Sequence, residues 1–210
     1  MLGNLTGGKP RFVIYKLNFK IVGNIKEFIA HLGDQNDFVS YVRTLEQGKK
    51  LDDLANFYNT PGGKRYLSVR NGPTKIVDFR HFFAAMLLTS KGFNTYSAKP
   101  EGVSLLMGVG NELNQCTSEI YAGKINSCFS NEDLGSNRLG AAFGEILNIS
   151  QSENRQESIA SLLDRYLTKL HPLTTSEVSK LQINSNADII RELIIAIIVG
   201  IKDAVISKAY

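Results

Sequence analysis

Apolar and polar positions alternate along most of the chain with the spacing of an amphipathic helix. After Asp34, a residue type that caps helix N-termini, apolar side chains recur at i, i+3, i+4 and i+7. This spacing predicts a helix that ends near Gln47 and buries one face. The residues of that face are Phe38, Tyr41, Val42 and Leu45.

Similar patterns predict further helices over residues 25–32, 51–58, 78–91, 103–121, 136–149, 157–170 and 188–208. The capping-box pattern of Ser or Thr followed three residues later by Asp or Glu begins at Ser130, Thr174 and Ser185. The helix over residues 188–208 is apolar over most of its circumference, so we expect it to be buried or to dock on a partner.

Strand-like patterns are confined to the first third of the chain. Residues 11–22 carry β-branched and aromatic side chains, and residues 65–69 and 75–77 flank an Asn-Gly pair that suits a hairpin turn. We therefore predict a mainly α fold, a compact helical domain with a small N-terminal β element. The domain spans residues 1–210, or divides into a mixed α/β part over 1–77 and a helical core over 78–210.

Composition supports a single globular domain and argues against nucleic-acid binding. Of the 210 residues, 43% are hydrophobic and 21% charged, a balance typical of globular domains. Lys and Arg number 24 against 20 Asp and Glu, which gives a net charge of +4. The basic residues are scattered and form no stripe interleaved with aromatic residues, so we do not favour a nucleic-acid partner.

No segment reads as a membrane span or a cleavable signal. The longest apolar run, residues 193–201, has nine residues, whereas a spanning helix needs ~20. The first ten residues lack both a basic region and an apolar stretch. If the protein leaves the cell, we therefore expect a secretion route that does not depend on a cleavable signal; otherwise we expect a cytoplasmic location.

Common cofactor and metal motifs are missing from the sequence. The G-x-x-x-x-G-K match at residues 3–9 is followed by Pro10 instead of Ser or Thr, so it is not a phosphate-binding loop. Cys116 and Cys128 lack the paired spacing of a zinc finger, and they could equally form a disulfide or remain free thiols. A papain-like pair, with either cysteine as the nucleophile and His81 as its base, is an alternative. Neither cysteine stands in a sequence context typical of a nucleophile. No metal ligand is assigned, and any cofactor is unknown.

The helix over residues 78–91 carries the clearest candidate chemistry. Asp78 and His81 are three residues apart, so they lie side by side at the edge of an apolar face. A carboxylate beside an imidazole fixes its tautomer and raises its basicity, as either a general base or a metal ligand requires. Alternatively, Asp78 is a helix cap and His81 a hydrogen-bonded boundary residue.

Two glycine-flanked segments supply further candidates. Glu112, close to Gly108 and Gly110, is a candidate catalytic acid. Asp133, Asn137 and Arg138 are candidate substrate-binding residues, although Asp133 also fits a capping box. Glycines are costly in helices, so we expect either a ligand or another helix to approach closely here. The glycines concerned are Gly108, Gly110, Gly135, Gly140 and Gly144.

The order of these segments resembles that of bacterial secreted effector and polymorphic-toxin domains. The segments are D-x-x-H-F at residues 78–82, then residues 108–115, then the Asp-, Asn- and Gly-rich residues 133–144. The resemblance implies a secreted toxin with an enzymatic target in the envelope or the cytoplasm of a competitor. Together with the Asp–His spacing and the glycine-flanked segments, it leads us to expect hydrolytic activity on a polymeric or envelope substrate such as peptidoglycan. It also implies a cognate inhibitor of the immunity type as a partner.

The site hypothesis makes a geometric prediction. If His81 is the base, it should lie within about 10 Å of Glu112 or Asp133 and line a pocket that solvent can reach. The alternative function is a non-catalytic helical interaction domain that binds a partner or itself through residues 188–208.

Overall fold

The computed structural model describes residues 30–91, 100–121, 131–153, 156–174 and 177. Its elements, in order, are helix α2 (Gln35–Gly48), 3-10 helix η1 (Leu51–Asn59), strands β1 (Tyr66–Ser68) and β2 (Ile76–Asp78), and helices α3 (Phe79–Ser90), α4 (Pro100–Tyr121), α5 (Asn131–Ser152) and α6 (Ile159–Lys169). The predicted mainly α fold with a small β element is confirmed. The predicted strand over 11–22 and the helix over 188–208 lie outside the described residues, and most of 25–32 does as well.

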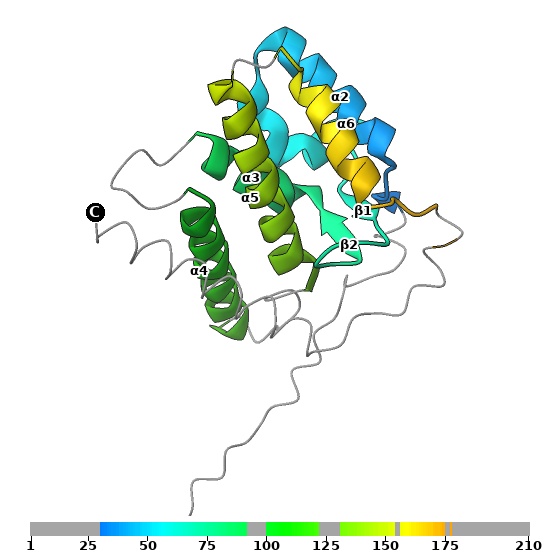
Figure 1. Cartoon of the computed structure of the whole chain (residues 1–210). Coiled ribbons are helices and arrows are strands. Elements are labelled where there is room, and N and C mark those ends of the chain that lie inside the picture. Colours follow the sequence, from blue (N-terminus) through cyan, green and yellow to red (C-terminus); the bar gives the residue numbers. More distant parts are fainter. Residues whose placement is uncertain (1–29, 92–99, 122–130, 154–155, 175–176, 178–210) are drawn as a thin grey trace, which may run out of the picture.

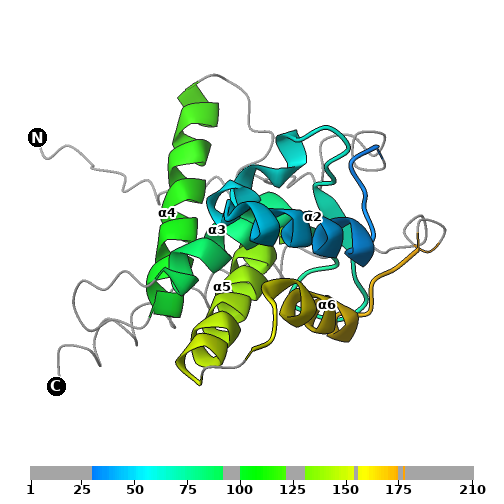
Figure 2. The same cartoon turned by 90° about the horizontal axis from the view of Figure 1, so that it is seen from above.

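The helices form three groups side by side. Helices α3 and α5 lie against each other in the middle, with α2 and α6 on one side and α4 on the other (Figures 1 and 2). The short hairpin lies beside the start of α5, because β2 packs against that helix. Among the described residues, no helix combines the length and the apolar character needed to span a membrane.

A cluster of aromatic rings joins α3 to its neighbours. Phe79 stacks on Phe38 of α2 with ring centroids 3.6 Å apart, and Phe82 stacks on Phe143 of α5 at 5.8 Å. Burial of each such ring contributes on the order of 2 kcal/mol from the area removed from water. The apolar arc predicted for α3 is therefore the centre of the core, and the polar residues of its first turn are left at one end of it. The fully buried phenylalanines are Phe38, Phe79, Phe82, Phe83 and Phe143.

The hairpin is confirmed and determines where α3 begins. Tyr66 pairs with Asp78 and Ser68 with Ile76 in an antiparallel ladder. Strand β2 runs directly into α3, so Asp78 is both the last strand residue and the N-cap of the helix. The hairpin thereby determines the direction in which the first turn of α3 points.

Helix α5 begins at Asn131, five residues before the predicted start at 136. The capping pattern at residues 130–133 therefore marks the helix start better than the later apolar spacing. Ser130 itself lies outside the described residues. As a result, Asp133 lies in the first turn of α5 and Asn137 one turn further along.

The glycines of α5 allow close contact between α5 and α3. A Cβ at Gly140 would lie 2.0 Å from the carbonyl oxygen of Phe82, and one at Gly144 would lie 2.8 Å from that of Met86. Neither glycine lines the pocket described below. Of the two explanations for these glycines, helix packing is therefore correct.

Replacing Gly140 by Ala should destabilise the protein by about 1–3 kcal/mol, because the new methyl group forces α3 and α5 apart. The matched control is Gly110→Ala in α4, where an added Cβ meets nothing within 4 Å. That change should stabilise the helix by up to about 1 kcal/mol. Urea unfolding followed by circular dichroism measures both, and equal stabilities for the two variants would contradict the packing.

Candidate active site

His81 lies in the first turn of α3 and faces carboxylates from two other helices. Its Nε2 atom is 3.0 Å from Oδ1 of Asp133 on α5, and its Nδ1 atom is 4.0 Å from Oε1 of Glu112 on α4. His81 is 7% exposed, Asp133 3% and Glu112 0%. The predicted proximity of His81 to Glu112 or Asp133 is therefore confirmed for both residues.

Asp78 occupies the helix-cap position and is held by several groups. Its Oδ1 accepts the backbone N–H of Arg80 at 2.9 Å, and its Oδ2 accepts two bonds from Arg65, at 2.9 Å from Nε and 2.6 Å from Nη2. Its own N–H donates to Oγ of Ser136 at 2.7 Å. Within the described structure Asp78 makes no hydrogen bond to His81, so the acidic partner of the imidazole is Asp133 from α5, not the predicted Asp78.

Arg80 places a positive charge among these groups. Its Nη2 lies 2.6 Å from Nε2 of His81, 3.6 Å from Oδ2 of Asp78 and 4.0 Å from Oδ1 of Asp133. Nε2 of His81 can accept from Arg80 when it carries no proton, or donate to Asp133 when it does, but not both at once. The protonation of His81 therefore determines whether its ring pairs with Arg80 or Asp133.

The surroundings of His81 raise its pKa. Burial alone lowers the pKa, because an imidazolium is poorly solvated there, and the charge of Arg80 acts in the same direction. The charge of Asp133, its hydrogen bond and the charge of Asp78 more than offset these effects and raise the pKa above the ordinary 6.5. His81 is consequently a stronger base than a free histidine, as acid–base catalysis near neutral pH requires.

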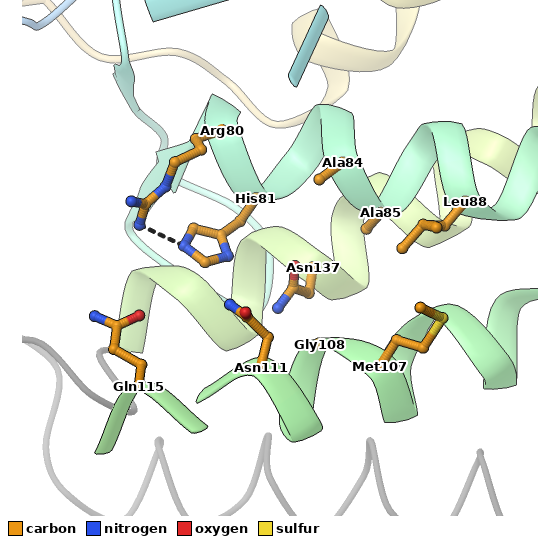
Figure 3. Close-up of a pocket in the computed structure, with 10 residues that line it drawn as sticks. All are labelled: Arg80, His81, Ala84, Ala85, Leu88, Met107, Gly108, Asn111, Gln115 and Asn137. Carbon is orange, nitrogen blue, oxygen red and sulfur yellow. Dashed lines mark hydrogen bonds between the residues drawn. The ribbon is translucent and has the colours of Figure 1, made fainter. Parts of the chain in front are cut away.

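A pocket of about 370 Å³ opens beside His81, between α3, α4 and α5 (Figure 3). This volume suits a small ligand or part of a polymer. His81 and Arg80 line one end, and the Nδ1 side of the imidazole faces Asn111. The remaining lining residues are Ala84, Ala85, Leu88, Met107, Gly108, Gln115 and Asn137.

The predicted site residues divide into three sets. His81 and Asn137 line the pocket. Glu112 and Asp133 are buried next to the His81 ring and do not line the pocket. Asp133 therefore does not occupy the substrate-binding position that we predicted for it. Arg138 is half-buried on α5 and is not among the residues that line this pocket.

The sequence also left two functional candidates unnoticed. Arg65 belongs to the Lys64-Arg65 doublet, one of two basic doublets in a sequence whose basic residues are otherwise scattered, but its side chain binds Asp78. Arg80 contacts Nε2 of His81. Arg80 could have been suspected from the sequence, because it stands between Asp78 and His81 in the chain. Arg65 could not, because strand pairing brings it to Asp78 from 13 residues away.

Within the described part of the chain, Asp78, His81 and Asp133 could hold a metal ion, because each offers a ligand atom and these atoms lie within 4.8 Å of one another. The guanidinium of Arg80 already lies among them, at the distances given above. A divalent ion would have to displace that cation, and Oδ2 of Asp78 is engaged by Arg65. The residues therefore fit a guanidinium-held acid–base cluster better than a metal site.

Comparison with known protein families, with curated proteins and with solved structures found no match for the chain. The resemblance to effector and toxin domains therefore stays a prediction. The side chain of Cys116 and all of Cys128 lie outside the described residues, so their pairing stays a prediction as well.

Replacing Asp133 by Asn should lower the pKa of His81, because the nearest negative charge is lost while burial and Arg80 remain. Histidine ring resonances followed by NMR against pH measure this pKa, and His31 and His171 act as internal controls. In the native protein we expect His81 to titrate above 6.5. A pKa of His81 that does not change in Asp133→Asn would contradict the assigned pair.

The same substitution should alter how stability depends on pH. A raised pKa in the folded state stabilises the protein fully below the unfolded value of 6.5, and this contribution is lost as pH rises through the folded pKa. The free energy of unfolding of the native protein, relative to Asp133→Asn, should therefore fall over that interval. Urea unfolding at a series of pH values measures the difference.

Replacing Arg65 by Gln should cost about 3 kcal/mol of stability, because the buried Asp78 carboxylate loses its hydrogen-bonded cation and keeps only the more distant Arg80. Asp78 is 0% exposed. The matched control is Arg165→Gln, which breaks a surface pair with Glu157. That variant should lose less than about 1 kcal/mol. Equal losses in thermal or urea unfolding would argue against the ion pair as a structural anchor.

Proposed function

We propose that this protein is a hydrolytic enzyme in which His81 is the general base. One observation carries the proposal: a buried imidazole, paired with Asp133 and raised in pKa, lines a pocket of ligand size. A carboxylate–imidazole pair in a pocket is the arrangement that activates water or a hydroxyl group in many enzymes. A histidine with only a structural role would not need a pocket beside it.

In the proposed mechanism Asp133 holds the proton on Nε2, so that Nδ1 carries the free lone pair. Nδ1 lies on the side of the ring that faces Asn111 (Figure 3). It would take a proton from a water molecule in the pocket as that water attacks the substrate. Asp133 then stabilises the imidazolium, and the protonated ring returns the proton to the leaving group.

Two further residues act on His81 rather than on the substrate. Glu112 is fully buried 4.0 Å from Nδ1, so in this proposal it favours the protonated ring and does not contact the substrate, unlike the catalytic acid that we predicted. Arg80 competes with Asp133 for Nε2 and keeps the resting pKa of His81 from rising further. Asp78 positions the first turn of α3.

We further propose that the enzyme is an antibacterial effector or toxin domain, on the basis of the resemblance of residues 78–82, 108–115 and 133–144 to such domains. Secretion without a cleavable signal, an envelope polymer such as peptidoglycan as substrate, and a cognate inhibitor as partner belong to the same proposal. The alternative interaction domain depends on residues 188–208, which lie outside the described residues.

Expression in a bacterial host tests the proposal. The native chain, sent to the cytoplasm or to the periplasm, should slow growth in at least one compartment, and His81→Asn should restore growth because the base is lost. Removal of a catalytic base typically lowers the rate about 10²–10⁴-fold. Growth curves with matched expression levels provide the measurement.

The matched control is His171→Asn, the same chemical change on an exposed residue. His171 has a φ of 52°, a left-handed conformation that Asn tolerates well. This control should remain as toxic as the native chain. Toxicity that persists in a folded His81→Asn protein would contradict a catalytic His81.

A further inference from the structure

The side-chain amide of Asn137 is buried in the pocket wall without a hydrogen-bond partner. Asn137 is 6% exposed, and its Nδ2 atom finds no partner among the described residues. Buried polar groups in folded proteins are nearly always hydrogen-bonded, since leaving one unpaired costs about 1–3 kcal/mol. An unpaired amide that lines a pocket is therefore best explained by a ligand that completes it.

Helix α4 has a glycine, Gly108, at the point where it passes this amide. An added Cβ at Gly108 of α4 would lie 2.6 Å from Nδ2 of Asn137, so a side chain there would push the amide away. Figure 3 shows the side chains of Asn111 and Asn137 extending toward each other, from α4 and α5. Two amides, each able to donate and to accept, therefore face the same pocket as His81.

We infer that this pocket binds an uncharged, peptide-type amide, with Asn137 as the residue that holds its carbonyl and N–H groups. An amide ligand offers one acceptor and one donor, which is the complement of an asparagine side chain. The inference rests on the proposed function for the place of the bound amide next to the base His81 and for the reaction described below, but not for the binding itself.

The other pocket walls indicate what flanks the amide. Ala84, Ala85, Leu88 and Met107 give one side a small apolar surface, so a short aliphatic group such as the side chain of alanine or an acetyl methyl fits beside the amide. Arg80 and His81 are the charged or ionisable side chains that line the pocket, and Asp78, Glu112 and Asp133 are not among its lining residues.

The reaction that follows is amide hydrolysis. His81 takes a proton from water, and the water oxygen forms a bond to the carbonyl carbon held by Asn137. The C–N bond then breaks, and the nitrogen leaves with the bonding electron pair and the proton from the imidazolium. The products are a carboxylic acid and an amine, and water is the only co-reactant.

The test uses the full chain and two probes of the same shape, N-methylpropanamide and methyl propanoate. Only the first has an N–H group. Titrations followed by NMR report the Kd of each probe and the shift of the Asn137 side-chain amide signals. We expect the native protein to bind the amide about tenfold more tightly than the ester, because the ester lacks one hydrogen bond. We also expect the amide to shift the Asn137 side-chain signals.

Variants then identify the residue. Asn137→Ala should weaken amide binding about tenfold. It should leave the melting temperature unchanged or higher, because the removed amide had no partner to lose. Gly108→Ala should weaken amide binding in the same way. The controls are Gly110→Ala on the same helix and Asn36→Ala at an exposed position of α2, and neither should change the Kd.

The outcomes separate this inference from the proposed function. His81→Asn should keep its affinity for the amide, since the base is not needed for binding. Amide binding that depends on Asn137, in a chain that shows no toxicity through His81, supports the subsite and contradicts the hydrolase. Equal binding of the two probes, no binding of either, or an unchanged Kd in Asn137→Ala overturns the subsite, whatever the toxicity assay shows.

Discussion

The carboxylate of Asp78 is the group on which the rest of this structure depends. It is fully buried, caps α3, accepts two bonds from Arg65 next to β1, and its residue donates an N–H to Ser136 on α5. A charge at this depth is stable only while all its partners are present. Hairpin, α3 and α5 are consequently held in one arrangement, and that arrangement directs His81 away from the aromatic core and toward Asp133.

Close packing of α3 against α5 brings Asp133 into contact with His81. Gly140 and Gly144 let the two backbones approach, which is why the first turn of α5 can present Asp133 to a histidine from the first turn of α3. Asp133 lies in the first turn of α5, where the positive end of the helix dipole favours a carboxylate. The packing that stabilises the core therefore also determines the charge next to the imidazole.

The site combines an acid–base pair with a pocket that has polar and apolar walls. His81 is a stronger base than a free histidine because Asp133 and Asp78 outweigh burial and Arg80. Asn137, beside Gly108, brings to the same pocket a side-chain Nδ2 that has no hydrogen-bond partner in the described part of the structure. The proposed hydrolysis and the inferred amide binding both rest on these two features of the pocket.

Local sequence by itself determined the helices, their caps and the hairpin, because side-chain spacing and capping act within a few residues: Asp34 begins α2, and Asp78 begins α3. It also indicated His81 and its candidate partners. Only the tertiary structure decided which carboxylate meets the imidazole, that Arg65 neutralises Asp78, and that Gly140 serves packing whereas Gly108 makes room for Asn137. These outcomes depend on contacts between residues far apart in the chain, which helix periodicity does not encode, since it specifies one face of a helix but not the neighbour that covers it.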